Sequence, residues 1–381
     1  MKSAAEKTKI LFILHMPPPV HGAAMVGQYI HDSQLINAEF DCRYINFTTA
    51  QSLEDVGKGG VKKLKTFLNL IKSIKKEIRA FNPDWIYITP NSAGKPFYKD
   101  FVIVQFCKYI SKAGIILHFH NKGVKSKEKK FFDNLLYKRF FKNTKVILIA
   151  KPLQEDIQKY VSPQDCYICH NGIPQIHHIQ PKRENKIPHI LWLTNIMRTK
   201  GLMEFVDALK ILKDRGITFQ ADFIGGITQE ITKDEFQQKL NENGLGDCTI
   251  YHGEKYGNEK DSFLQQADIF VLPSYTEAFP LSILEAMQYS IPVVTNNVGG
   301  ICDAIENGSN GILLGGNKPV IEYNLQADSK ELADAIETLI SNPDMRKTMG
   351  ETAHKKYIES FTLESFYSKF HNVLQTIVND I

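Results

Sequence analysis

Short apolar runs alternate with longer amphipathic stretches along the whole chain, and this alternation limits the fold more than any other feature. Six runs in the first half and six in the second resemble buried strands, and helical patterns separate them. Such an order is typical of βαβ units in a parallel sheet, so we expect an α/β protein. The predicted strands lie at 9–14, 40–47, 84–89, 114–120, 145–150, 165–170, 189–195, 219–225, 248–253, 268–274, 291–296 and 311–315.

A polar, proline-punctuated stretch at 171–188 interrupts this pattern before it starts again. A chain of 381 residues is long enough for two domains, each with its own core. We therefore predict two doubly wound domains, residues 1–180 and 181–360, whose carboxyl strand ends face a central cleft where ligands bind. The amphipathic tail, about 361–381, is expected to pack as a helix on the first domain, with Phe361 on its apolar stripe.

Charge is unevenly distributed along the chain. Residues 1–182 hold 28 Lys and Arg against 14 Asp and Glu, whereas the whole chain has a net charge of +4. A basic half favours an anionic surface or ligand. No apolar stretch approaches the roughly 20 residues that span a bilayer, and the N-terminus does not resemble a signal peptide. With six scattered cysteines, expected to be reduced, these features predict a soluble or peripheral cytoplasmic protein.

The segment SYTEAFPLSILEAM, residues 274–287, has two charged groups, Glu277 and Glu285, among mostly apolar neighbours. Pro280 suits the first position of a helix, so the backbone N–H groups of Leu281 and Ser282 would form an anion site at its start. The two carboxylates would flank a phosphate there and accept hydrogen bonds from sugar hydroxyls. Alternatively, Glu277 is an ordinary N-terminal helix charge and Glu285 a solvated surface residue.

The longer stretch TEAFPLSILEAMQYSIPVVTNNVGGICDAIENGSNGILL resembles the donor-site signature of the retaining glycosyltransferases of family 4, which have the GT-B fold. This resemblance implies that Glu277 faces the transferred sugar and that Glu285 binds the nucleotide ribose. It also implies that the backbone around four residues holds the donor sugar and diphosphate. These residues are Phe279, Pro280, Leu281 and Ser282.

A second stretch, LWLTNIMRTKGLMEFVDAL, resembles the strand, loop and KG-initiated helix in which an arginine and a lysine of this family clamp the diphosphate. Lys200 and Gly201 match. Asn195 stands where the family has its arginine, and Arg198 lies close enough in the loop to substitute for it. Arg198 could equally be a solvated loop charge.

In the first half, strand 9–14 is followed by a loop and a helix that begins near Gly22 and Ala23, and in the family this loop lies against the donor phosphate and the acceptor. The family also has a histidine at the end of the strand matched by GIILHFHNK, which fits His120. A structural role for His120 is the alternative. Weaker candidates for acceptor contacts are Asn91, Lys95 and Asn121.

The helix predicted at 61–81 carries an apolar stripe opposite six lysines and Arg79. With KSKEKK at 125–130, this basic face could bind anionic lipid headgroups at a membrane surface. It could also be a solvated basic face. We expect a peripheral location at the inner face of the cell membrane.

The sequence contains no Asp-x-Asp triplet, so we expect neither a metal nor a cofactor, and protein cations would neutralise the diphosphate. The resemblance implies a retaining transferase that uses a nucleotide-sugar co-substrate, for which we expect a UDP-sugar. We expect a lipid-linked or growing oligosaccharide acceptor in surface polysaccharide biosynthesis (O-antigen, capsule or exopolysaccharide). The alternatives are a nucleotide-sugar epimerase of the same fold and a non-catalytic membrane- or nucleic-acid-binding protein. No nucleic-acid recognition module is evident, so we expect no nucleic-acid partner.

Overall fold

The computed structural model describes residues 7–18, 21–47, 61–177, 185–316, 318–321 and 325–380, with only the backbone at 61–63. The chain divides into two compact units. The first comprises Met1–Gly172 and Leu363–Ile381, and the second comprises Ile173–Thr362. The sequence pattern predicts the domain boundary at 180/181, which lies outside the described residues.

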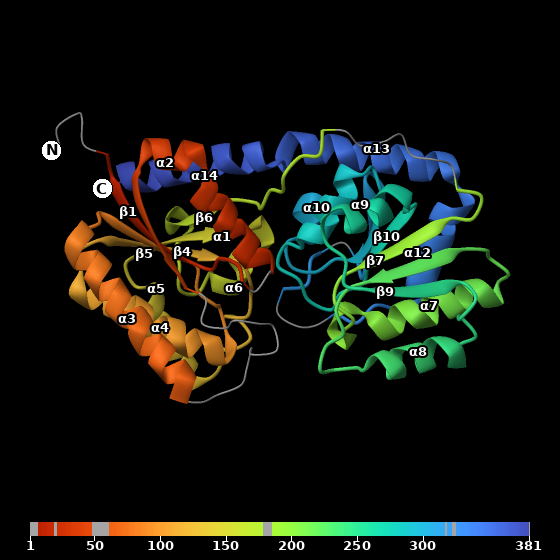
Figure 1. The fold of residues 1–381 in the computed structure, drawn as a ribbon, viewed down its shortest axis with the longest axis horizontal. Coiled ribbons are helices and arrows are strands. Elements are labelled where there is room, and N and C mark those ends of the chain that lie inside the picture. Colours follow the sequence, from red (N-terminus) through yellow and green to blue (C-terminus); the bar gives the residue numbers. More distant parts are fainter. Residues whose placement is uncertain are drawn as a thin grey trace. The chain divides into compact units, whose positions relative to one another are not determined.

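The first unit contains a six-stranded parallel sheet in the order β2-β1-β3-β4-β5-β6 (Figure 1). Its strands are β1 (Lys9–Leu14), β2 (Asp41–Asn46), β3 (Trp85–Ile88), β4 (Gly114–Phe119), β5 (Thr144–Leu148) and β6 (Cys166–Ile168). Its α-helices are α1 (Gly22–Asp32), α2 (Gln34–Glu39), α3 (Val61–Phe81), α4 (Gly94–Ile110), α5 (Phe131–Phe141), α6 (Gln154–Ile157) and α14 (Leu363–Asn379).

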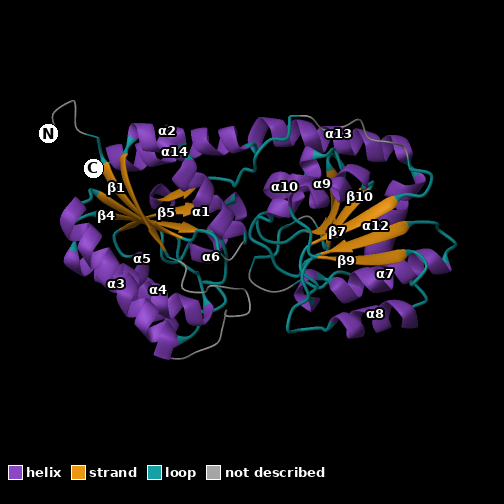
Figure 2. Ribbon diagram, in the orientation of Figure 1, coloured by secondary structure: helices purple, strands orange, loops and turns teal. Residues whose placement is uncertain are grey.

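The second unit repeats this design with a parallel sheet in the order β12-β11-β10-β7-β8-β9 (Figure 2). Its strands are β7 (His189–Leu193), β8 (Gln220–Ile224), β9 (Thr249–Gly253), β10 (Ile269–Leu272), β11 (Val293–Asn296) and β12 (Gly311–Leu314). Its α-helices are α7 (Leu202–Asp214), α8 (Lys233–Glu242), α9 (Gly257–Gln266), α10 (Leu281–Gln288), α11 (Ile301–Ala304), α12 (Ser329–Ser341) and α13 (Pro343–Ser360), and a 3-10 turn, η4, spans Arg198–Lys200.

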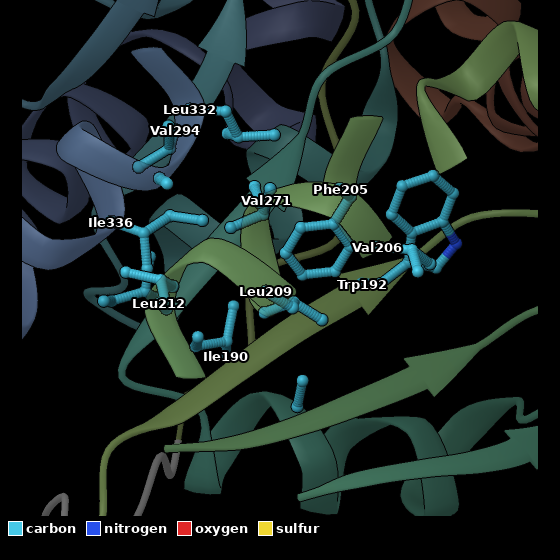
Figure 3. Close-up of a cluster of buried hydrophobic side chains, with 14 of the residues drawn as sticks. Ile190, Trp192, Phe205, Val206, Leu209, Leu212, Val271, Val294, Leu332 and Ile336 are labelled. Atoms are coloured by element: carbon cyan, nitrogen blue, oxygen red, sulfur yellow. The ribbon is translucent and has the colours of Figure 1, made fainter. Parts of the chain in front are cut away.

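The core of the second unit fixes the start of the loop after β7. Trp192 is fully buried and stacks on Phe205 of α7, with ring centroids 5.7 Å apart, inside the cluster shown in Figure 3. Its indole Nε1 donates to the carbonyl oxygen of Thr194 at 2.9 Å, which satisfies the buried N–H. The packing of β7 against α7 therefore orients the first residues of this loop.

All twelve predicted strands are present, and the predicted α/β class with two doubly wound parallel sheets is confirmed. The tail differs in detail from the prediction. Phe366, Phe370 and Leu374 of α14 are buried in the first unit, where α14 packs against α2 (Figure 1). Phe361, expected on the same stripe, instead ends α13 in the second unit because the helix breaks between Ser360 and Leu363.

Helix α3 buries only part of its apolar stripe. Leu70, Ile74 and Ile78 are buried, whereas Leu64 and Leu68 are 59% and 49% exposed. The side chains of Lys62 and Lys63 lie outside the described part. Among the helices of the described ranges, none combines the length and apolar character required to cross a membrane.

Candidate functional site

The strand order of the second unit reverses between β7 and β10, which are neighbours in the sheet. Ligands of doubly wound sheets bind outside the carboxyl ends of the strands at such a switch point. The loop after β7 carries Lys200, and the loop after β10 carries Glu277. The two predicted donor-site stretches therefore meet at the position where this architecture binds ligands.

A close backbone contact joins these two loops. Gly201 has φ +80°, and a Cβ there would lie 2.1 Å from the carbonyl oxygen of Pro273. The backbone N–H of Tyr275 also donates to the carbonyl oxygen of Thr199 at 3.0 Å. The structure thus explains why a glycine follows Lys200, since only glycine lets the start of α7 approach the end of β10 so closely.

Lys200 and Glu277 form an ion pair, with Nζ and Oε1 2.5 Å apart. Their side chains are 25% and 11% exposed, so both charges are partly withdrawn from water. A carboxylate in such a place needs a partner, and Lys200 is that partner. The pair also places one cation and one hydrogen-bond acceptor side by side, which suits a ligand that has both phosphates and hydroxyls.

Helix α10 begins directly after this pair. Pro280 is its N-cap residue rather than its first helical residue, a shift of one position from the prediction, and no side chain caps the helix. Within the described residues, the backbone N–H groups of Leu281 and Ser282 have no acceptor. Such N–H groups, with the helix dipole, attract an anion. Phe279 is buried and contacts Phe361, with ring centroids 5.6 Å apart.

Two consecutive glycines hold the Glu277 loop from the other side. Gly299 has φ +58°, and a Cβ there would lie 1.9 Å from the carbonyl oxygen of Glu277. The backbone N–H of Gly300 donates to the carbonyl oxygen of Ala278 at 2.8 Å. The sequence pointed to this pair only through the motif, and the structure gives it a function as a support for the loop.

The second glutamate of the motif has a partner that the sequence analysis missed. Lys260 of α9 donates from Nζ to Oε1 of Glu285 at 2.5 Å, and each side chain is 23% exposed. Burial raises the pKa of Glu285, and Lys260 opposes this rise. The alternative of a solvated surface glutamate is therefore wrong. No sequence signal could identify Lys260, because it is 25 residues away in a polar helix.

A buried carboxylate that the sequence analysis also missed supports the loop after β10. Glu204, in the first turn of α7, is 4% exposed. Its Oε1 accepts hydrogen bonds from the Tyr275 hydroxyl at 2.7 Å and from Gln326. Burial and then Glu204 raise the pKa of Tyr275, while the positive charge of Arg198 opposes the rise. The hydroxyl thus ties the loop after β10 to α7.

Asn195 has a structural role at the position where the family has an arginine. Its Oδ1 accepts from the backbone N–H of Gly226, in the loop after β8, at 3.3 Å. Arg198 is exposed, and its backbone N–H donates to Glu230 at 2.9 Å. In the described part of the chain, its guanidinium forms no ion pair. That Arg198 replaces the missing arginine remains a prediction.

In the first unit, the strand order reverses between β1 and β3, and the loop after β1 carries His15 and His21. His21 caps α1 by accepting from the backbone N–H of Ala24 at 3.3 Å, so Gly22 and Ala23 form the first turn as predicted. A Cβ at Gly27 would lie 1.9 Å from the carbonyl oxygen of His15. Glycine therefore lets α1 pass close to the end of β1.

His120 follows β4, and its ring lies 4.3 Å from that of His118, centroid to centroid. His118 is fully buried and hydrogen-bonds through Nδ1 to the Tyr87 hydroxyl at 2.5 Å, so it is a structural histidine. Burial, and then His21, lower the pKa of His120 to about 4, which keeps its ring neutral. Neither of its ring nitrogens has a partner within the described chain. Buried, unpaired polar atoms of this kind suit a ligand.

The weaker acceptor candidates behave differently from one another. Asn91 donates from its backbone and side chain to buried Asp100, both at 2.8 Å, and its Oδ1 accepts from Asn121 at 3.2 Å. Asn121 in turn accepts from the backbone N–H of Ser92 at 2.8 Å. These two amides therefore stabilise the loop itself. Lys95 is exposed in the first turn of α4. Contacts of these residues with an acceptor remain a prediction.

The described residues contain no group of three or more His, Cys, Asp or Glu side chains that could share a metal ion. Cys166, on β6, and Cys169, just after it, are free thiols.

Comparison with known proteins agrees with this geometry. Residues 174–356, nearly all of the second unit, match the family Glycosyl transferases group 1. Together with its two parallel sheets, this match defines the class: a GT-B-fold chain whose second unit matches the Glycosyl transferases group 1 family.

Among curated proteins, D-inositol 3-phosphate glycosyltransferase of Paenarthrobacter aurescens is 34% identical over 189 residues, which cover 47% of this chain and 43% of that enzyme. N,N'-diacetylbacillosaminyl-diphospho-undecaprenol alpha-1,3-N-acetylgalactosaminyltransferase of Campylobacter jejuni is 24% identical, covering 69% of this chain and 70% of that enzyme. The chain spans less than half the length of the first curated relatives it matches. HepE of Anabaena, solved in complex with UDP-glucose, is similar in fold, with a TM-score of 0.70 at 17% identity over 97% of this chain and 100% of that chain.

Proposed function

We propose that this protein is a retaining glycosyltransferase that moves a sugar from a nucleotide-sugar donor, a UDP-sugar, to a lipid-linked or growing oligosaccharide acceptor. The observation that carries this proposal is the Lys200–Glu277 pair at the β7/β10 switch point, next to the uncapped start of α10. A relative that acts on a diphospho-undecaprenol-linked sugar and a similar fold that holds UDP-glucose support the acceptor and donor classes.

In this proposal, the donor diphosphate binds the free N–H groups of Leu281 and Ser282 and the ammonium of Lys200. These groups stabilise the negative charge that develops on the leaving nucleoside diphosphate, which is usually the largest contribution to such catalysis. Arg198 supplies a further cation. Protein cations and N–H groups thus neutralise the diphosphate charge, as a metal ion would, and the reaction uses no cofactor.

The carboxylates recognise hydroxyls. Glu277, held by Lys200, accepts hydrogen bonds from the transferred sugar, and Glu285, held by Lys260, accepts from the ribose. The first unit binds the acceptor, and neutral His120 hydrogen-bonds to a sugar hydroxyl rather than acting as a nucleophile. The acceptor hydroxyl attacks the anomeric carbon from the face that the nucleoside diphosphate leaves, and a donor phosphate oxygen takes the hydroxyl proton. Because the new bond forms on the face where the old bond breaks, the anomeric configuration is retained. The basic first unit brings the enzyme to the inner face of the cell membrane.

The first test is a thermal-shift screen with UDP-, GDP-, ADP- and CMP-sugars, since a ligand that binds the folded state stabilises it. We expect a UDP-sugar to give the largest shift. The anomeric configuration of the product, read by NMR, then tests retention. Isomerised donor in the absence of acceptor would favour the epimerase instead, and indifference to all nucleotide sugars would contradict the proposal.

A further inference from the structure

A basic surface hollow lies between the C-terminal parts of α4 and α5, at the end of the first sheet where β4 begins. It has a volume of about 810 Å³. Five of its lining side chains are cations, and none of its lining residues is an Asp or Glu. The cations are Lys108, Lys112, Lys138, Arg139 and Lys142. The hollow lies at the amino ends of the strands, so it is separate from the candidate site residues of this unit, which follow the carboxyl ends.

One of these cations is already engaged by the protein. Lys108 donates from Nζ to the carbonyl oxygens of Phe140 at 2.8 Å and Lys142 at 2.7 Å, which satisfies the C-terminal end of α5. Burial, followed by the charges of Arg139 and Lys142, lowers the pKa of Lys108 to about 8. Burial is thus the main cause of the shift, and the two neighbouring cations add to it.

The other cations have no carboxylate partner among the residues that the structure describes. Arg139 donates from Nε to the amide oxygen of Gln105 at 3.3 Å. Lys112, Lys138 and Lys142 form no ion pair in this part of the chain. Four like charges around one hollow repel one another, so an anion placed among them would be stabilised.

An apolar ridge on α5 continues directly from the hollow. Phe131 and Phe132 are each 76% exposed, and Leu135, which also lines the hollow, is 57% exposed. Residues 131, 135, 138 and 142 follow helical spacing, so one face of α5 changes from apolar to basic along its length. On neighbouring α4, Tyr98 is 48% and Val102 is 49% exposed. Exposed aromatic groups beside cations are typical of a surface that enters a membrane interface.

We propose that the α4–α5 face docks on an anionic membrane, with Phe131 and Phe132 in the interfacial layer and a phospholipid phosphate in the basic hollow. The cations alone would suit any phosphate. The exposed ridge on the same helix face selects a lipid, because a soluble anion would leave two phenylalanines in water. This docking face specifies how the protein would meet the membrane in the proposed function, and it rests on that proposed function. The main membrane contact would then lie on α4 and α5 instead of α3, where the sequence predicts it.

The test is co-sedimentation of the full chain with phosphatidylcholine vesicles, with and without phosphatidylglycerol. We expect binding only to the anionic vesicles. At about 1 kcal/mol per cation near the surface, Lys138→Gln/Lys142→Gln should weaken binding roughly 30-fold. The matched control is Lys347→Gln/Lys355→Gln, which removes two exposed charges from α13 and should bind like the unmodified protein. Phe131→Ser/Phe132→Ser should also weaken binding at least tenfold.

Three results would overturn the proposal. The first is no binding to anionic vesicles, which would leave only a site for soluble phosphate. The second is unchanged binding by the Lys138/Lys142 variant. The third is unchanged binding by the phenylalanine variant, which would leave an electrostatic contact in which the phenylalanines take no part. All substituted side chains are exposed, and a thermal melt confirms that each variant is folded. Transfer to a water-soluble acceptor, measured in parallel, separates the two proposals, since a variant can lose vesicle binding while it keeps transfer, and the reverse.

Discussion

Replacing Gly299 by alanine should displace the Glu277 loop, and a second glycine in the same unit provides the control. Gly299 has φ +58°, and its new Cβ would lie 1.9 Å from the carbonyl oxygen of Glu277. Gly308 has φ +77° with no atom within 4 Å of a new Cβ. Both substitutions carry the left-handed backbone penalty of about 1–2 kcal/mol. Only Gly299→Ala adds a steric conflict, for which overpacked sites give roughly 1–3 kcal/mol.

The two variants can be compared within the second unit alone. The chain has two tryptophans, Trp85 in the first unit and Trp192 in the second. In a Trp85→Phe background, fluorescence during urea unfolding therefore reports the unit that holds both glycines. We expect Gly308→Ala to lose about 1–2 kcal/mol and Gly299→Ala about 2–5 kcal/mol.

Activity should separate the variants more sharply than stability. Under conditions where both are folded, Gly308→Ala should keep its kcat/KM, whereas Gly299→Ala should lose at least tenfold because a shift of about 1 Å in a positioning group is costly. Equal unfolding free energies and equal kcat/KM for the two variants would refute the reasoning that Gly299 supports the Glu277 loop.

Three further predictions concern individual side chains. Lys260→Met removes the partner of Glu285 and should raise the pKa of that carboxyl further, so the KM for the donor should rise as the pH falls. An additional Glu285→Gln change should abolish this pH dependence. A KM of the Lys260→Met variant that is independent of pH would contradict the prediction. The pKa of His120 falls from 6.5 to about 4 on folding, so protonation favours the unfolded chain and stability is lost as the pH drops through this range. His120→Gln should recover part of that loss, on the order of 3 kcal/mol, when urea unfolding at pH 4.5 is compared with unfolding at pH 7.5. An unchanged pH dependence would be evidence against this role of His120. Tyr275→Phe deprives the buried carboxylate of Glu204 of a donor and should cost about 1–3 kcal/mol in urea unfolding. This cost should disappear if Glu204→Leu, which removes the acceptor, is already present.

The sequence was sufficient for the strands because a buried parallel strand is a short, nearly continuous apolar run. Pro280 also predicted the start of α10 to within one residue. The end of the chain was harder, because Phe361 fits a helical stripe by spacing, yet a helix break assigns it to the other unit. Spacing alone does not show where a helix stops.

Only part of the candidate site could be predicted from the sequence. The motif supplied Lys200 and the two glutamates, but their supports come from distant elements. Lys260 and Glu204 are ordinary charged residues of amphipathic helices, and only the fold brings them to the site. The basic hollow between α4 and α5 likewise depends on two helices whose cations lie about 30 residues apart in the chain.

In the proposed mechanism, Lys200 stabilises the departing diphosphate while it holds Glu277 in place. The most direct measurement compares kcat/KM for sugar transfer by Lys200→Met and by Lys347→Met, a matched change at an exposed lysine of α13. We expect a loss of roughly 10²-fold or more for Lys200→Met and no loss for the control. A loss of less than tenfold at Lys200, with the protein folded, would contradict it.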